Sequence, residues 1–284
     1  MKLLILKSAL LLSALSAAGC FFGGESDSPT SIYDGGPKQN DTLPKVKKIV
    51  PGLYVGSYSE YDTSAQTIES ELLLNADGSY RLFYIFGEVA FYDQSGTWFQ
   101  KDSSLYFLNA QKSDIDPDFG IFPPATKLEN DTNALVSVTD SSFRRLEYTP
   151  LRQKPYWISY KRKSAPALKE GTYFMEKTVA KDSVVADMKM VIDLLKGDFA
   201  FSYSESGIVT FQMKAKYSLA GTFLITENNS YRRIDTTDAF GEWTPLDGYS
   251  VQRLKSVEDT AFSMLSSIFG YSRGYWDSYS LVPK

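Results

Sequence analysis

The sequence predicts an all-β protein of two tandem small antiparallel up-and-down β-barrels, preceded by a signal peptide and a disordered tether. Two observations carry this prediction: an internal repeat over most of the chain, and short apolar segments separated by polar turns within each copy. The chain has 284 residues, of which 43% are hydrophobic, enough to bury a core in each copy. It has no His and one Cys, which excludes His-based triads, His-ligated metals and an intrachain disulfide. The formal net charge of −4 gives no reason to expect a nucleic acid partner.

Residues 1–19 have the pattern of a secretory signal peptide, with a positively charged start and an apolar run over 8–18 that is too short for a stable transmembrane helix. The run ends at the sequence AAGC, which resembles the lipobox of bacterial lipoproteins. The resemblance implies that Cys20 carries lipid, palmitate included, and anchors the protein to a membrane. An ordinary signal peptide followed by an incidental Cys is the alternative. Phe21, rather than Asp, after the Cys favours the outer membrane.

The segment 20–46 is rich in Gly, Ser, Asp and Pro and has no sustained hydrophobic period, so we expect a disordered tether. Removal of the signal peptide takes away two Lys residues and leaves a net charge of −6. No other apolar run approaches membrane-spanning length. We therefore expect a soluble body that is lipid-anchored to the bacterial cell envelope.

An internal repeat follows at a constant offset of 119 residues, which we align without a gap. It runs from Gly52, matched by Gly171, to the closing segments YWISY and YWDSY at 156–160 and 275–279. A gapless match of this length is typical of a duplication. It predicts two homologous barrels at 47–163 and 168–284, joined by a linker at 164–167.

Turn chemistry predicts the strands of each copy. In copy one, the apolar segment 71–74 is followed by the turn NADG and by the strand 80–86; copy two has a Lys-Gly-Asp turn at the matching place. A Leu-Tyr-Phe-Leu strand follows at 105–108 after a polar turn. Strands at this spacing indicate a sandwich or a barrel. The segment 251–269 also fits a helical stripe, but its counterpart 139–150 is short and ends in Pro, so we predict strands there.

Four short motifs in copy one indicate a family resemblance: Gly-x-Tyr at Gly52, Asp-Gly-x-Tyr at Asp77, Gly-x-Trp at Gly96 and Leu-x-Phe at Leu105. They resemble the small lipocalin-like barrels of bacterial envelope lipoproteins, in particular the N-terminal domain of the copper-resistance lipoprotein family known as NlpE. The resemblance implies a lipocalin-like architecture. That family's Cys-x-x-Cys is absent, because Cys20 is the only cysteine, so copper binding does not carry over.

Repeated aromatic residues are the candidate ligand-binding residues. Aromatic rings with nearby hydroxyl groups can stack on sugar rings or line an apolar pocket. The alternative is that they fill the barrel, with the Trp of the closing strand plugging one end. The candidates are Tyr84, Trp98, Trp157, Tyr203, Tyr217 and Trp276.

The segment 80–86 (YRLFYIF) is apolar on both faces. One face should fill the barrel, so the other must be covered by the neighbouring domain, a partner or lipid. An eight-stranded barrel can either pack solid or hold one small ligand. Because the two copies differ in charge, we expect a cavity to persist in one copy and to be closed in the other.

The loop 114–120 places an Asp at every second position, which could bind Ca²⁺. It departs from an EF-hand, since Gly120 comes one place late and Ala125 replaces the bidentate Glu, so we expect a solvated acidic loop with no metal and no cofactor. The expected function is non-catalytic: binding of a small apolar or aromatic ligand, or of an envelope protein. The alternatives are an envelope hydrolase with a carboxylate cluster between the domains and a purely structural scaffold.

Overall fold

The computed structural model describes residues 47–59, 67–116, 120–147, 156–181, 184–234, 239–266 and 275–283. The predicted signal peptide, Cys20 and the tether lie outside these residues. Every regular element of the described ranges is a β-strand. No helix in this part of the chain is long and apolar enough to cross a membrane.

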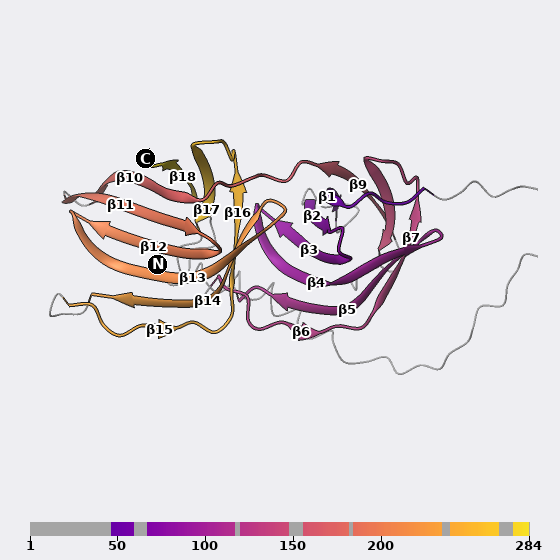
Figure 1. The fold of residues 1–284 in the computed structure, drawn as a ribbon, viewed down its shortest axis with the longest axis horizontal. Helices are drawn as coiled ribbons and strands as arrows, with labels where there is room; N and C mark the ends of the chain where they lie inside the picture. The colour runs from indigo at the N-terminus through magenta and orange to yellow at the C-terminus, as the bar shows by residue number, and fades with distance from the viewer. Residues whose placement is uncertain are drawn as a thin grey trace, which may run out of the picture. The chain divides into compact units, whose positions relative to one another are not determined.

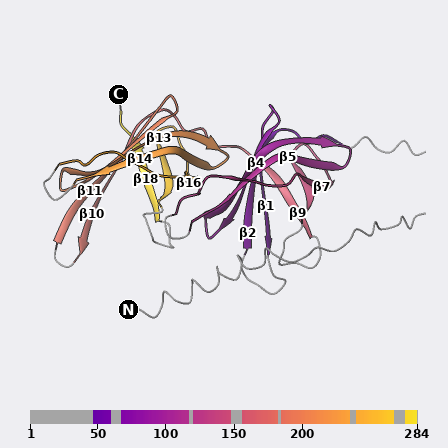
Figure 2. The same ribbon diagram turned by 90° about the horizontal axis from the view of Figure 1, so that it is seen from below.

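The first half of the chain forms a closed antiparallel barrel, which we call barrel 1. Its strands follow one another around the ring in chain order, and β1 closes the ring against β9, beside which it lies in Figure 2. The short strand β6 pairs with β5 outside this ring. The strands are β1 Gly52–Ser59, β2 Thr67–Leu74, β3 Ser79–Phe86, β4 Val89–Lys101, β5 Ser104–Asp114, β6 Thr126–Lys127, β7 Asp131–Val136, β8 Ser142–Glu147 and β9 Tyr156–Lys163.

The second half repeats this plan as barrel 2, with β10 closing against β18 and β15 pairing outside the ring (Figure 1). The predicted fold class of two tandem eight-stranded up-and-down barrels is confirmed. The helical alternative for 251–269 is wrong over its described part, which forms β16 and β17. The strands are β10 Gly171–Lys181, β11 Val184–Leu195, β12 Asp198–Glu205, β13 Ile208–Ala220, β14 Phe223–Arg233, β15 Thr244–Pro245, β16 Ser250–Lys255, β17 Ala261–Ser266 and β18 Tyr275–Leu281.

The gapless alignment is wrong in one place. Most strands repeat at the offset of 119, but in β2 and β11 the matching residues are Leu74 and Leu194, which pair with Gly52 and Gly171 respectively. The first hairpin of barrel 2 is therefore one residue longer, and its next turn is shorter by the same amount. A shift of one residue would turn every side chain of a strand to the opposite face, so the extra residue keeps the apolar side chains of β11 inside.

Each barrel begins with a tyrosine that fixes the incoming chain. Tyr54 donates through its hydroxyl to the Val50 carbonyl at 2.6 Å, and Tyr173 donates in the same way to the Lys169 carbonyl at 2.8 Å. Each tyrosine ring also packs on a Phe in the interior of its own barrel, with 4.8 Å between ring centroids in both cases. The duplicated sequence thus produces duplicated contacts as well as duplicated strands.

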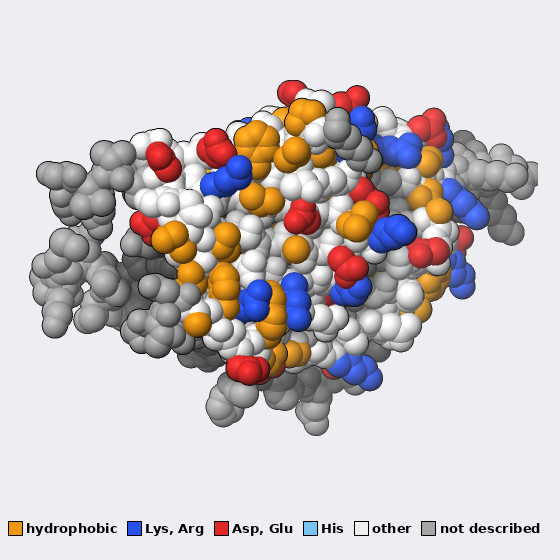
Figure 3. All heavy atoms as spheres, turned by 60° about the vertical axis from the view of Figure 1, so that its left-hand side comes forward, with side chains coloured by type: hydrophobic (Ala, Val, Ile, Leu, Met, Phe, Trp, Pro, Cys, Tyr) orange, Lys and Arg blue, Asp and Glu red, His pale blue; other side chains and the backbone are white. Residues whose placement is uncertain are grey.

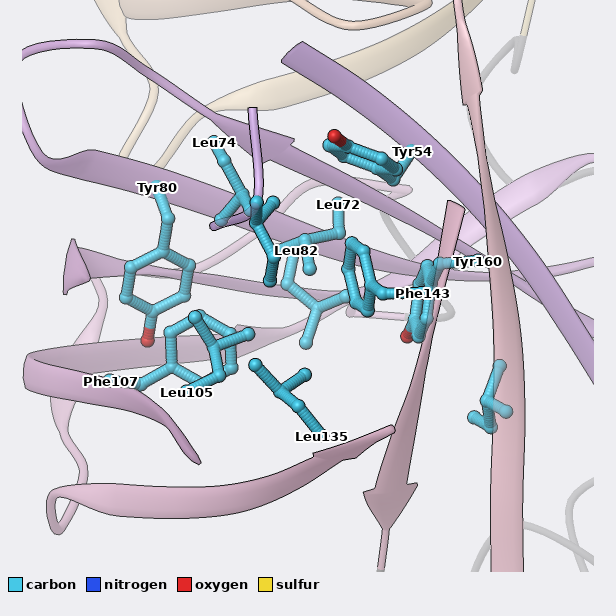
Figure 4. Packing of buried hydrophobic residues seen from close by; sticks show 12 residues of the cluster. Tyr54, Leu72, Leu74, Tyr80, Leu82, Leu105, Phe107, Leu135, Phe143 and Tyr160 are labelled. Atoms are coloured by element: carbon cyan, nitrogen blue, oxygen red, sulfur yellow. The ribbon is translucent and has the colours of Figure 1, made fainter. Parts of the chain in front are cut away.

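Barrel 1 has a densely filled interior. Apolar side chains from seven of its strands converge there, as Figure 4 shows for ten labelled residues. Tyr80 and Phe107 lie 4.2 Å apart between ring centroids, and Phe143 stacks on Tyr160 at 5.2 Å. Burial raises the pKa of Tyr80 to about 12, so its hydroxyl stays protonated and accepts a hydrogen bond from Gln94 at 2.7 Å.

The outer face of β3 is covered by barrel 2. The sequence analysis had given the neighbouring domain, a partner and lipid as the three alternatives. Phe83 and Ile85 join a second apolar cluster with Phe223 and Ile225 of β14. The rings of Phe83 and Phe223 lie 4.4 Å apart between centroids. Because these side chains are almost fully buried, their removal from water stabilises the contact between the barrels.

A buried carboxylate completes this contact. Glu71 accepts hydrogen bonds from the backbone N–H of Thr222 at 2.5 Å and from its hydroxyl at 2.7 Å. Gly221 precedes Thr222 in the left-handed conformation, with φ of +60°, and any Cβ there would collide with the Glu71 carboxylate. The turn between β13 and β14 therefore needs glycine both for its backbone and for the space that Glu71 occupies.

Two further charged groups cross the contact. Asp93 accepts from Arg81 Nε at 2.9 Å and from the Tyr249 hydroxyl at 2.7 Å. Arg253 donates to Glu69 at 2.7 Å. Glu71, Asp93 and Glu69 thus each have a specific partner on barrel 2.

Candidate functional site

Barrel 2 encloses a cavity of about 600 Å³ in its interior. Its wall is mainly apolar and comes from most of the strands of the barrel, with Gly120 and Ile121 of the preceding half also contributing. The other end of the barrel is filled, where Tyr173 packs edge-on against Phe262. The interior is therefore a pocket with one closed end. A cavity in one of the two barrels is what the sequence led us to expect.

Methionine is the distinctive residue of this wall. The chain has six Met, and apart from Met1 all of them lie in barrel 2. Four line the cavity, namely Met188, Met190, Met213 and Met264. Thioether side chains are flexible and polarisable and make favourable contacts with aromatic rings, so they adapt to ligands of different shape.

Aromatic side chains supply a second large part of the apolar wall. Phe199, Phe201, Tyr203, Phe211 and Tyr279 all line the cavity. Phe201 meets Phe211 edge-on at 6.0 Å between centroids. The Tyr279 hydroxyl lies 3.5 Å from the Met190 sulfur. Such a wall offers stacking and edge-on contacts to a flat apolar molecule.

Polar groups enter the cavity from the wall formed by β14 and β16. Asn229 and Gln252 each have a buried side-chain oxygen that receives no hydrogen bond from the described residues. The hydroxyl groups of Thr226 and Ser250 pair with each other at 2.6 Å. Arg233 also contributes to the lining, and its guanidinium lies over the rings of neighbouring aromatic residues.

Barrel 1 has a polar network at positions that match part of the cavity wall of barrel 2. Arg145 occupies the place of Met264 and pairs with Glu147 two residues along β8. The Tyr160 hydroxyl donates to Glu147 at 3.0 Å, and Ser70 donates to Tyr160 at 3.0 Å. Tyr84 donates to Glu147 at 3.1 Å. These side chains occupy the interior where barrel 2 has methionines and space.

The environment of Arg145 keeps this network charged. Burial acts to lower the pKa of Arg145, but the nearby Tyr160, Tyr84 and Asp131 outweigh it, so its pKa lies above the usual value. The guanidinium also lies over the Phe107 ring, 5.2 Å from its centroid. Arg145 is 2% exposed, so the charge depends on these neighbours rather than on water.

The structure separates the six predicted ligand-binding residues into four groups. Tyr203 lines the cavity, and Tyr84 belongs to the network of barrel 1. Trp98 and Tyr217 pack against the barrel cores, and the Trp98 indole donates to the Asn75 carbonyl at 3.1 Å. These two support the interior without lining the cavity.

Trp157 and Trp276 lie outside their barrels, and the expectation that they line a pocket or plug an end is wrong. Trp157 is 37% exposed, while the next residue, Ile158, is buried in the core. Trp276 donates to Glu88 of barrel 1 at 2.7 Å. Strand alternation separates the two faces of the closing strand, and the inward face carries Ile158 rather than the Trp.

The cavity residues that the sequence analysis missed are the methionines and the two amides. One signal was present: all methionines after Met1 fall in copy two, with Met188 and Met190 spaced to share one face of a strand. The positions of Asn229 and Gln252 gave no such signal, since single amides occur on many strands and turns.

The acidic loop has no metal-binding geometry in its described part. Asp114 forms an ion pair with Lys112 at 3.5 Å, and Asp116 bridges to Ile121 through its backbone. The segment 117–119 lies outside the described residues. Among the described residues no group of three His, Cys, Asp or Glu side chains could hold a metal ion.

The outer surface gives no sign of a second wide apolar site on the face drawn in Figure 3. Hydrophobic side chains there are interspersed with acidic and basic ones. The cavity therefore remains the strongest candidate site.

Comparison with protein-family models finds no match, and a search of curated proteins finds no significant similarity.

Proposed function

We propose that this chain is a non-catalytic ligand-binding protein of the bacterial cell envelope, in which barrel 2 holds one small, mainly apolar ligand. The cavity of about 600 Å³ carries the proposal. Its volume falls within the range of roughly 300–1,000 Å³ that is usual for small-molecule sites. An eight-stranded barrel is wide enough for one such ligand when its inward side chains do not fill it.

Barrel 1 serves in this proposal as a filled support. Its interior positions carry a paired Arg and Glu, and its outer face packs on barrel 2 through Phe83. Gly120 and Ile121, which lie between its β5 and β6, also line the cavity. One barrel thus binds the ligand, while the other stabilises and completes the site.

The location in the envelope rests on the N-terminal sequence. A signal-like segment ends at the lone Cys20, and Phe21 after it favours the outer membrane. The resemblance to envelope lipoprotein barrels agrees with this part of the proposal. Labelling cells with a palmitate analogue should mark the wild-type protein but not a Cys20→Ser variant; an unlabelled wild-type protein would contradict lipid anchoring.

Ligand binding is tested with N-phenyl-1-naphthylamine, an apolar probe whose fluorescence rises in apolar surroundings. Residues 45–284 form one compact unit, so a chain that starts at Phe21 retains it whole. We expect saturable binding of one probe per chain. Met213→Trp, which fills the cavity, should abolish binding, whereas Phe99→Trp on the exposed face of barrel 1 should leave it unchanged.

Circular dichroism must show that both variants keep their strands. Absence of saturable binding to the wild-type chain would contradict the proposed function. Equal binding by the wild-type and a folded Met213→Trp chain would place the probe elsewhere and would also contradict it.

A further inference from the structure

We propose that the cavity selects an uncharged aromatic ligand that carries an N–H or O–H group, which donates to one of the two amide oxygens of Asn229 and Gln252. This inference rests on the proposed function and names the ligand class. The two amide oxygens are buried acceptors without a donor among the described residues. A buried acceptor without a partner is unfavourable, so a ligand that supplies the donor gains binding free energy that a purely apolar ligand does not.

The orientation of the Asn229 amide is fixed by its surroundings. Its Nδ2 donates to the Thr226 carbonyl at 3.0 Å. A carbonyl can only accept, so the nitrogen must face Thr226 and the oxygen is left for another partner. The Asn229 backbone carbonyl also accepts from the Leu246 N–H at 2.8 Å, which holds the residue in place. Asn229 is 3% exposed and lines the cavity.

Gln252 brings a second acceptor to the same wall. It lies opposite Leu224 in the β14–β16 ladder, and the next pair on the same face of that ladder is Thr226 with Ser250. The hydroxyl groups of this pair bond to each other at 2.6 Å, one donating and the other accepting. The wall therefore offers two unpartnered acceptor oxygens beside a bonded hydroxyl pair.

The acceptor oxygens of the wall argue against an anionic ligand such as a fatty acid. A carboxylate would face two acceptor oxygens and would be repelled by them. Arg233 is the one charged residue among those described in the lining, and its guanidinium lies 5.7 Å from the centre of the Phe211 ring and 5.6 Å from that of Tyr231. The aromatic and thioether wall favours a flat, polarisable molecule.

Barrel 1 provides the natural contrast. The counterpart of Asn229 is Ala110, and the counterpart of Gln252 is Asn133, whose Nδ2 donates to Asp131 at 2.8 Å. The Asn229 acceptor thus occurs only in the copy with the cavity. The contrast also supplies a substitution, Asn229→Ala, that the homologous position already contains.

Three tricyclic ligands of nearly the same shape test the inference: carbazole has an N–H donor, fluorene a methylene group and dibenzofuran an acceptor oxygen. Equilibrium dialysis against the chain that starts at Phe21 gives the affinity for each. We expect all three to bind, with carbazole tighter than fluorene by about three- to tenfold. Dibenzofuran should bind no better than fluorene.

The variant Asn229→Ala with Gln252→Leu should lose the preference for carbazole while still binding fluorene at least as tightly as the wild-type chain does. Equal wild-type affinity for carbazole and fluorene would overturn the inference and leave the proposed function standing. An equal loss of affinity for all three ligands in the variant would also overturn it. If the wild-type chain binds none of the three, the proposed function fails together with the inference.

Discussion

On β8 of barrel 1 the inward position holds Arg145, whereas the matching position on β17 of barrel 2 holds Met264. The arginine requires partners, and Glu147, Tyr160 and Tyr84 converge on the same interior. The methionine requires none, and a cavity lies beside it. The comparison teaches that one backbone arrangement can form either a filled barrel or a binding barrel. Where an inward position holds a charged residue, the side chains that pair with it fill the interior.

The largest effect is expected when barrel 1 receives the residue of barrel 2. Arg145→Met leaves Glu147 buried without its cation, and loss of one partner of a buried pair should lower the free energy of unfolding by about 3–5 kcal/mol. The double variant Arg145→Met with Glu147→Ser copies barrel 2 at both positions and should recover most of this loss, because no unpaired charge remains. Urea denaturation measures both variants. A single variant within about 1 kcal/mol of wild type would contradict the role of the pair.

The next effect concerns the face that joins the barrels. Phe83→Ala removes a ring that is 1% exposed and packs on Phe223, so the free energy of unfolding should fall by about 3–4 kcal/mol. Phe99→Ala is the matched control, because Phe99 is 42% exposed on the same barrel and its loss should cost less than about 1 kcal/mol. Similar costs for the two variants would show that the contact between the barrels contributes little.

The smallest effect is a pH dependence at the same contact. Burial raises the pKa of Glu71 above its ordinary value of 4.5, although the hydrogen bonds from Thr222 partly oppose this. The carboxyl group therefore binds its proton more tightly in the folded protein than in the unfolded one. Its contribution to stability is full below the unfolded pKa and is lost as the pH rises through the folded pKa.

Glutamine does not titrate, so the variant Glu71→Gln does not lose this stabilisation as the pH rises. The stability of the variant relative to wild type should therefore increase from about pH 4 to about pH 7. The glutamine can still accept from the Thr222 N–H, which preserves the contact. Chemical denaturation of both proteins across this pH range gives the difference. A relative stability that is constant or decreases with pH would contradict the burial effect.

Much of the fold was predictable because local signals agreed with one another. The Asp-Gly turn, the alternating apolar residues and the repeat all indicated the same strands. The one-residue shift of β11 relative to β2 was not predictable, since an added residue in the first hairpin of barrel 2 and a lost residue in its next turn cancel in the alignment. Only the pairing of Leu74 and Leu194 with equivalent glycines reveals it.

The candidate site was less predictable for a related reason. Strand alternation divides the closing strand into two faces, but it does not say which face is inside, and Tyr160 lies inside because its hydroxyl group joins Ser70 and Glu147. A cavity depends on the summed volumes of side chains from strands far apart in the sequence. The structure places Tyr203 in the cavity wall and Trp276 outside the barrel, where it donates to Glu88.

One measurement tests directly whether barrel 2 is the binding barrel. Methyl-¹³C labelling of methionine reports on this barrel alone, because all Met residues after Met1 lie in it, and four of them line the cavity. During titration with N-phenyl-1-naphthylamine, the methyl resonances of Met188, Met190, Met213 and Met264 should shift together and saturate at one probe per chain, with a smaller change at Met175. Unchanged resonances at those four residues, while the probe binds, would contradict the assignment of the site to this cavity.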